Sequence, residues 1–211
     1  MPGSQVREKL LGVTTYSQEL GLYLWKVEDR FKWFLASVLF AKRISARIAM
    51  ATFREFENAG LTSPEAILTA GWDRLVEILD AGGYVRYDFS TASTLLEAMD
   101  KLLNTYGSLE ELHARATDSR DLENKLQQLK GVGPVAVSIF LRELRSIWPK
   151  ASPRPSPLSL AVAQKLGMAV SDLQLPGLES ALVRVHLDFC KKQKCVGCPV
   201  KEECFQPVST Q

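Results

Sequence analysis

The sequence lacks the features that mark several whole classes of protein. It has no apolar run near the ~18 residues of a membrane span, and its first segment, MPGSQVREKLLG, has no apolar core of a secretory signal. No stretch alternates strictly between apolar and polar residues, so no sheet is expected. No cysteine precedes position 190. We therefore expect a cytoplasmic chain with no membrane contact, whose thiols stay reduced, which counts against disulfides.

Helical periodicity accounts for most of the chain. Residues 31–60 carry apolar side chains at helical spacing and end in Asn-Ala-Gly, a natural helix stop. Ser63 and Pro64 are placed to cap and begin the next helix. The stretch 148–158, WPKASPRPSPL, has too many prolines for a helix interior and predicts an extended connector. With 46% apolar residues to fill a core, the prediction is an all-α chain of short helices.

Net positive charge is concentrated in two segments of the second half of the chain. Residues 140–165 hold five basic residues and one acidic residue, and so do residues 184–201. A chain with little net charge and a basic half can present one cationic face to a polyanion. The alternative is that these are ordinary solvated side chains.

Residues 126–141, LQQLKGVGPVAVSIFL, predict two helices joined by a glycine turn. The first helix ends at Lys130, and Gly131, Val132 and Gly133 form the turn. The second helix starts at Pro134, where unpaired backbone N–H groups and the helix dipole favour an anion such as a DNA phosphate. Taken alone, the turn fits an ordinary helical hairpin equally well.

All four cysteines lie in the last 22 residues, at Cys190, Cys195, Cys198 and Cys204. Thiolates from one short segment suit an iron–sulfur cluster. Zinc bound by four cysteines is the alternative, and the spacing alone does not exclude it.

These pieces together resemble the endonuclease III-like helix-hairpin-helix DNA glycosylases. The order of LKGVGPVAVSIFL, WPKASPRPSP, LSLAVAQKLG and CKKQKCVGCPVKEEC is that of the family. FLASVLFAKRISARIAMATF and DAGGYVRYDFSTA resemble two of its earlier segments, so the resemblance spans about residues 28–206. The first cysteine gap has four residues where the family usually has six.

The resemblance implies a two-domain architecture. A six-helix barrel would span residues 29–146 and contain the hairpin, and residues 1–28 with 147–211 would form a domain whose four cysteines hold a [4Fe–4S] cluster. Lesion-containing double-stranded DNA would lie between the domains of a nucleoid-associated monomer. Lys191, Lys192 and Lys194 would face the DNA backbone, and Lys42 would act as a wedge or backbone contact in the gap that an extruded base leaves.

The sequence departs from the family at its two catalytic positions. Val135 stands where bifunctional members have a lysine nucleophile, and Ser156 stands where nearly all members have an aspartate that stabilises charge on the sugar. No acidic residue occurs between Glu143 and Asp172. The implied activity is a monofunctional DNA glycosylase without efficient strand cleavage, acting best on uracil and then on alkylated bases. A non-catalytic relative that binds damaged or abasic DNA is the alternative, and a redox sensor on DNA is a third possibility.

The segment GGYVRYD is where relatives line the pocket for the extruded base. Tyr84 is expected to stack there, Arg86 to contact DNA, and Asp88 to replace the missing carboxylate. The alternative is that the tyrosines belong to the core and that Arg86 and Asp88 form a surface pair.

Overall fold

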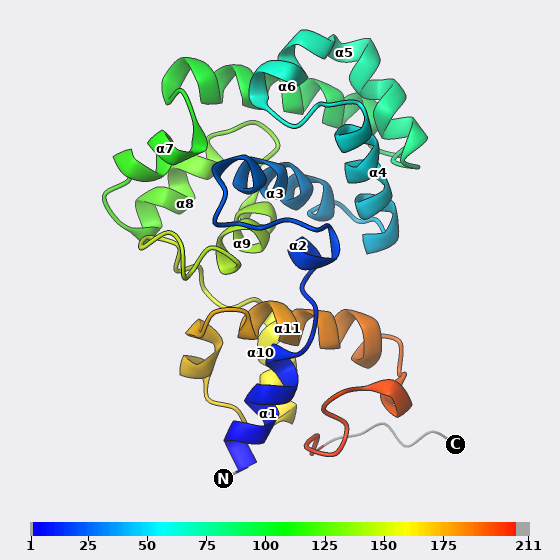
Figure 1. The fold of residues 1–211 in the computed structure, drawn as a ribbon, viewed down its shortest axis with the longest axis vertical. Helices are drawn as coiled ribbons and strands as arrows, with labels where there is room; N and C mark the ends of the chain where they lie inside the picture. The colour runs from blue at the N-terminus through cyan, green and yellow to red at the C-terminus, as the bar shows by residue number, and fades with distance from the viewer. Residues whose placement is uncertain (1, 206–211) are drawn as a thin grey trace.

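The described chain is helical, which confirms the all-α prediction. The computed structural model describes residues 2–205, with residues 2 and 3 described by their backbone alone, and none of these residues lies in a strand. Figure 1 shows two lobes, with the N-terminal helix in the lower lobe beside the C-terminal helices. Residue 1 and residues 206–211, which the predicted second domain includes, lie outside the described part.

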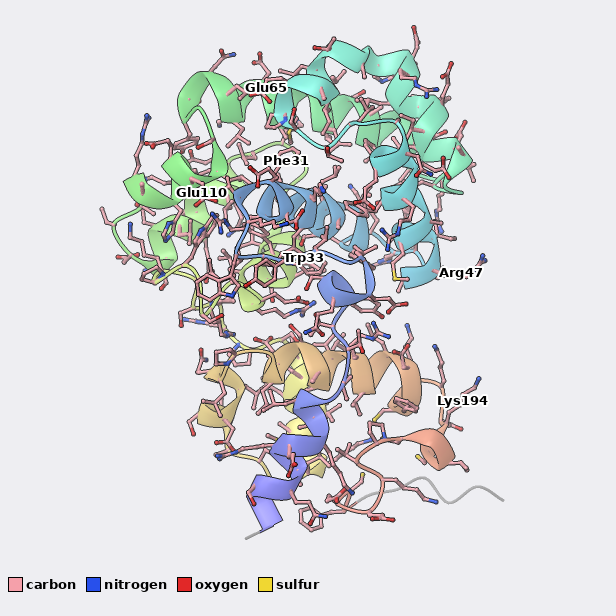
Figure 2. All side chains as sticks on the ribbon, in the orientation of Figure 1. Phe31, Trp33, Arg47, Glu65, Glu110 and Lys194 are labelled. Carbon is pink, nitrogen blue, oxygen red and sulfur yellow. The ribbon has the colours of Figure 1, made fainter. Side chains whose placement is uncertain are left out.

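The upper lobe is built around one long buried helix, α3. Its helices are α2 (Tyr16–Glu19), α3 (Val27–Phe40), α4 (Ala46–Asn58), α5 (Pro64–Ala81), α6 (Asp88–Thr105), α7 (Leu109–Arg115), α8 (Ser119–Gln127) and α9 (Pro134–Arg142). The indole of Trp33 in α3 donates to the carbonyl of Phe140 in α9 at 3.3 Å. The rings of Phe34 and Phe140 meet edge to face, 5.4 Å between centroids. These contacts fix α9 against the centre of the lobe, and Figure 2 shows Trp33 within it.

Local sequence signals set the helix boundaries. The Ser63 hydroxyl accepts a hydrogen bond from the backbone N–H of Ala66, and Pro64 begins α5, as predicted. Gly71 bends α5 with a φ of +73°, in the left-handed region that favours glycine. Residues 151–156 of the predicted connector form no helix.

The lower lobe has its own hydrophobic core, formed from both ends of the chain. Its elements are α1 (Pro2–Leu11), α10 (Pro157–Lys165), η1 (Val170–Gln174), α11 (Leu178–Val185), η2 (His186–Cys190) and η3 (Cys195–Gly197). Val6 and Leu10 of α1 are buried against Leu178 and Leu182 of α11 and against Val200 in the cysteine loop. The N-terminal segment therefore packs with residues from the last quarter of the chain. The barrel topology and the domain boundaries stay predictions.

Buried charges join the two lobes. Arg145, just after α9, pairs with Glu179 of α11 at 2.5 Å, and their side chains are only 5% and 1% exposed. The other Glu179 oxygen accepts a hydrogen bond from the backbone N–H of Ser156 at 2.9 Å. Arg145 also donates to the carbonyl of Pro153 at 2.9 Å. The second half of the proline connector, at Pro153 and Ser156, is thus held by one ion pair.

We expect Glu179→Ala to destabilise the protein by about 3–5 kcal/mol, because it leaves the Arg145 guanidinium buried without a counter-charge. Denaturant unfolding measures the change. The matched control is Glu77→Ala, which removes the exposed partner of Arg74 and should cost less than about 1 kcal/mol. Equal costs for the two variants would contradict the role given to the buried pair.

Candidate nucleic-acid interface

A cleft of about 1400 Å³ lies between the lobes. Its walls come from α4 and the loop before it, from α8 and α9, from the proline connector, and from α11 and η2. The basic side chains that line it are Lys42, Arg43, Arg47, Arg142, Arg154, Arg184, Lys191 and Lys192. The acidic ones are Glu19, Glu123 and Asp188. This excess of cations over anions makes the interlobe cleft electropositive, which suits a polyanion.

The loop before α4 supplies Lys42 and Arg43, and the first turn of α4 supplies Arg47. Ser45 caps α4 by accepting from the backbone N–H of Ile48 at 3.2 Å, which fixes the turn that carries Lys42 and Arg43. Figure 2 shows Arg47 at the lower end of α4, at the same edge of the molecule as Lys194 in the lower lobe. Lys42 lines the cleft, which its predicted role as a wedge or backbone contact requires. Arg43 and Arg47 were not predicted as site residues, although their closeness to Lys42 in the chain is itself a basic pattern.

The glycine turn joins α8 to α9, and α9 begins at the cleft. Gly131 has a φ of +76°, and a Cβ atom there would approach Thr94 to 2.9 Å, so both backbone and space require glycine. Gly133 caps α9 and has open space around it. Val132 is buried, so only its main chain is available to a ligand, and Lys130 is exposed. Of the residues predicted here, Val135 lines the cleft and is 59% exposed.

Ser156 faces the same cleft from the start of α10. Its hydroxyl accepts from the backbone N–H of Ser159 at 3.2 Å, while its own N–H is held by Glu179. The cap and the first turn of α10 are thereby fixed in the cleft wall. The structure brings Val135 and Ser156, the two positions singled out by the resemblance, to one cavity.

The GGYVRYD segment does not line the interlobe cleft. Tyr84 is 1% exposed, its hydroxyl donates to the Leu39 carbonyl at 2.8 Å, and burial raises its pKa well above the usual range. It is a core residue. Asp88 is the first residue of α6, where its carboxylate accepts from the N–H of Phe89, and burial together with Asp88 raises the pKa of the neighbouring Asp80. Arg86 is exposed and lies over the ring of Tyr87.

Two of the three cleft acids are already paired. Arg184 donates to Glu19 and, at 2.9 Å, to Asp188, and it also lies over the ring of Tyr16, 4.1 Å from its centroid. Asp188 additionally meets Lys192 at 3.4 Å. These pairs fix the side of the cleft where α11 continues into η2.

The four cysteines lie at the edge of the lower core, and all are free thiols. Burial raises the pKa of both Cys190 and Cys198, and the charges of the other cysteines raise it further. Residues 2–205 contain no group of three or more His, Cys, Asp or Glu side chains that could hold a metal ion. The donor set suits a thiolate-bound cluster, but the thiols are not gathered into a closed site. The [4Fe–4S] cluster stays a prediction.

The cysteine loop is nevertheless anchored on both sides. Lys9 of α1 pairs with Glu203 at 2.7 Å. The backbone N–H of Phe205 donates to the Lys165 carbonyl at 2.9 Å, and the Phe205 ring packs against Gly167. Lys191 and Lys192 reach the cleft from this loop, whereas Lys194 does not line it.

Comparison with known proteins identifies no family for this chain. No protein-family model and no curated protein matches the chain. Among the residues that the structure describes, no helix is long and apolar enough to cross a membrane.

Purified protein should be yellow-brown, with a broad absorbance near ~400 nm, because four thiolates are expected to bind iron and sulfide rather than zinc. Cys198→Ser should remove the colour and loosen the loop while the upper lobe stays helical by circular dichroism. Val196→Ser, at an exposed position in the same loop, is the matched control and should keep the colour. Colourless protein with one zinc ion per chain would overturn the cluster.

Proposed function

We propose that this chain is a DNA glycosylase of the endonuclease III-like kind, which binds lesion-containing duplex DNA in the interlobe cleft and releases the damaged base. One observation carries the proposal. The start of α9 after the glycine turn, the capped start of α10 and the cationic loop before α4 all line one cleft. A phosphate backbone is the polyanion that such a combination of helix starts and guanidinium groups suits.

DNA would be held mainly through its backbone. Lys42, Arg43 and Arg47 offer charge from the upper lobe, and Lys191 and Lys192 offer it from the lower lobe. The first turn of α9 adds main-chain N–H groups, which contact phosphate without reading sequence. Affinity should therefore be similar for all sequences and fall steeply with salt.

The cleft also has room and apolar surface for an extruded base. Its volume exceeds that of ordinary small-molecule sites. Val135 and Leu158 expose apolar side chains within it. Extrusion into such a site is how enzymes that act on a base reach it. We expect uracil to be the preferred substrate and alkylated bases to come next, because these bases leave the sugar most easily.

Val135 makes the proposed chemistry monofunctional. A valine cannot attack the sugar to form a Schiff base, so the base would be lost by hydrolysis and the strand would stay intact. We also propose that the upper lobe is a six-helix barrel domain and that the lower lobe is a [4Fe–4S] domain. In that arrangement the cluster has a structural role, holding the loop that presents Lys191 and Lys192.

A second candidate is a non-catalytic protein that binds damaged or abasic DNA. The observation that favours it is the chemistry of Val135 and Ser156. Both line the cleft, and neither side chain carries an amine or a carboxylate. Binding through the cationic walls would need neither group.

Gly133→Glu should weaken binding to duplex DNA by ~10-fold or more, alike for every sequence, because a carboxylate would face phosphate at the start of α9. Fluorescence anisotropy on unrelated duplexes measures the change. Gly133→Ala is the matched control, since the space around Gly133 is open, and it should bind as wild type does. Gly131 is unsuitable, because any side chain there meets Thr94. Normal binding by Gly133→Glu would show that the turn is merely structural.

In single-turnover assays on duplexes with uracil, oxidised pyrimidines, alkylated purines or mismatches, wild type should release uracil without cutting the strand. Borohydride should trap little covalent complex, because position 135 offers no amine. Val135→Lys is the reciprocal variant and should increase trapping. Efficient trapping by wild type would point to another amine, and Lys42→Gln tests the one that lines the cleft. Release of no base from any lesion would leave only the binding candidate.

A further inference from the structure

Hydrolysis of a glycosidic bond develops positive charge on the sugar, and enzymes stabilise that charge with a nearby carboxylate. The carboxylate must lie in the cavity that holds the sugar and must be free to face it. Glu19, Glu123 and Asp188 are the only acids among the described residues that line the interlobe cleft.

Glu19 and Asp188 are not free. Both are bound by the guanidinium of Arg184. The counter-charge of Arg184 offsets much of the negative charge of each of these carboxylates, so their attraction for a second cation is weak. In residues 2–205, Glu123 forms no ion pair, although the charge of Arg154 in the proline connector acts on it from a distance.

The position of Glu123 is set by the hairpin itself. It lies on α8, one helical turn before Gln127, and both side chains line the cleft. The same hairpin places Val135 in the cleft from its second helix, and the connector brings Arg154 and Ser156 there. Glu123 is half-buried. Burial raises its pKa, while Arg154 lowers it again in part and so favours the charged form.

We propose that Glu123 is the carboxylate that stabilises the deoxyribose as the base leaves. This inference rests on the proposed function. The bond between C1′ and the base nitrogen breaks, and its electron pair leaves with the base. Water then adds to C1′, and the proton that it gives up neutralises the departed base anion. Glu123 stays ionised throughout and forms no covalent bond. Asp88, the residue that the sequence suggested for this role, lies outside the cleft lining.

The test uses the full-length protein and duplexes with one abasic analogue. One analogue is a pyrrolidine, whose ring nitrogen carries positive charge, and the other is the neutral tetrahydrofuran. Wild type should bind the pyrrolidine duplex ~10-fold or more tightly than the tetrahydrofuran duplex, because only the former mimics the charged sugar. Glu123→Gln should lose that preference and still bind the tetrahydrofuran duplex within about 3-fold of wild type, since its side chain has nearly the same shape.

Glu111→Gln is the matched control, an exposed glutamate on α7 that does not line the cleft, and it should keep the preference. In single-turnover assays Glu123→Gln should release base about 100-fold more slowly than wild type, and Glu123→Asp should recover part of the loss. Equal binding of the two analogues by wild type, or an unchanged preference in Glu123→Gln, overturns the assignment of Glu123 while DNA binding stands. If wild type binds neither analogue better than undamaged duplex, the proposed function fails and the assignment fails with it.

Discussion

The structure depends on one buried ion pair, between Arg145 and Glu179. Arg145 follows the last helix of the upper lobe, and Glu179 lies in the first turn of α11 in the lower lobe. Two charges removed from water are stable only when each is paired and hydrogen-bonded. Here the carboxylate also holds the start of α10, and the guanidinium holds the carbonyl of Pro153. These bonds connect the end of the upper lobe to α11 and to the start of α10 in the lower lobe.

A second buried contact acts beside the first. The carboxylate of Glu143 accepts hydrogen bonds from the hydroxyls of Ser17 and Thr15, in and just before α2. Burial raises its pKa, while these hydroxyls and Arg142 oppose that shift. The segment that returns from α1 to the upper lobe is thereby tied to the end of α9. The chain thus crosses between the lobes at two places, one held by the half-buried Glu143 and the other by the buried Glu179.

This arrangement explains how short helices from two lobes can form one site. The starts of α9 and α10 belong to different lobes, yet both reach the cleft because the connector between them is held rigid. Cations from α4 and the loop before it, and from the residues that follow η2, complete the walls. The proposed DNA glycosylase activity rests on that shared cavity, and the role proposed for Glu123 rests in turn on that activity. The cysteine loop contributes at a distance, by presenting two lysines to the same space.

The sequence by itself determined that the described chain is helical and where several of its helices begin. Ser63 with Pro64, Ser156 with Pro157 and the proline-rich connector act within a turn or two of chain, so their effect is readable locally. It did not determine which side chains meet. Tyr84 was expected to line a pocket, but it is buried and its hydroxyl donates to the Leu39 carbonyl in α3. Asp88 was expected to act on the sugar, but it lies next to Asp80. Glu123 gave no separate signal, and Arg47 and Arg184 gave only a basic pattern. Their place in one cleft depends on how α3 packs against α9 and on the ion pair between Arg145 and Glu179. Such contacts join residues far apart in the chain, and only tertiary packing decides them.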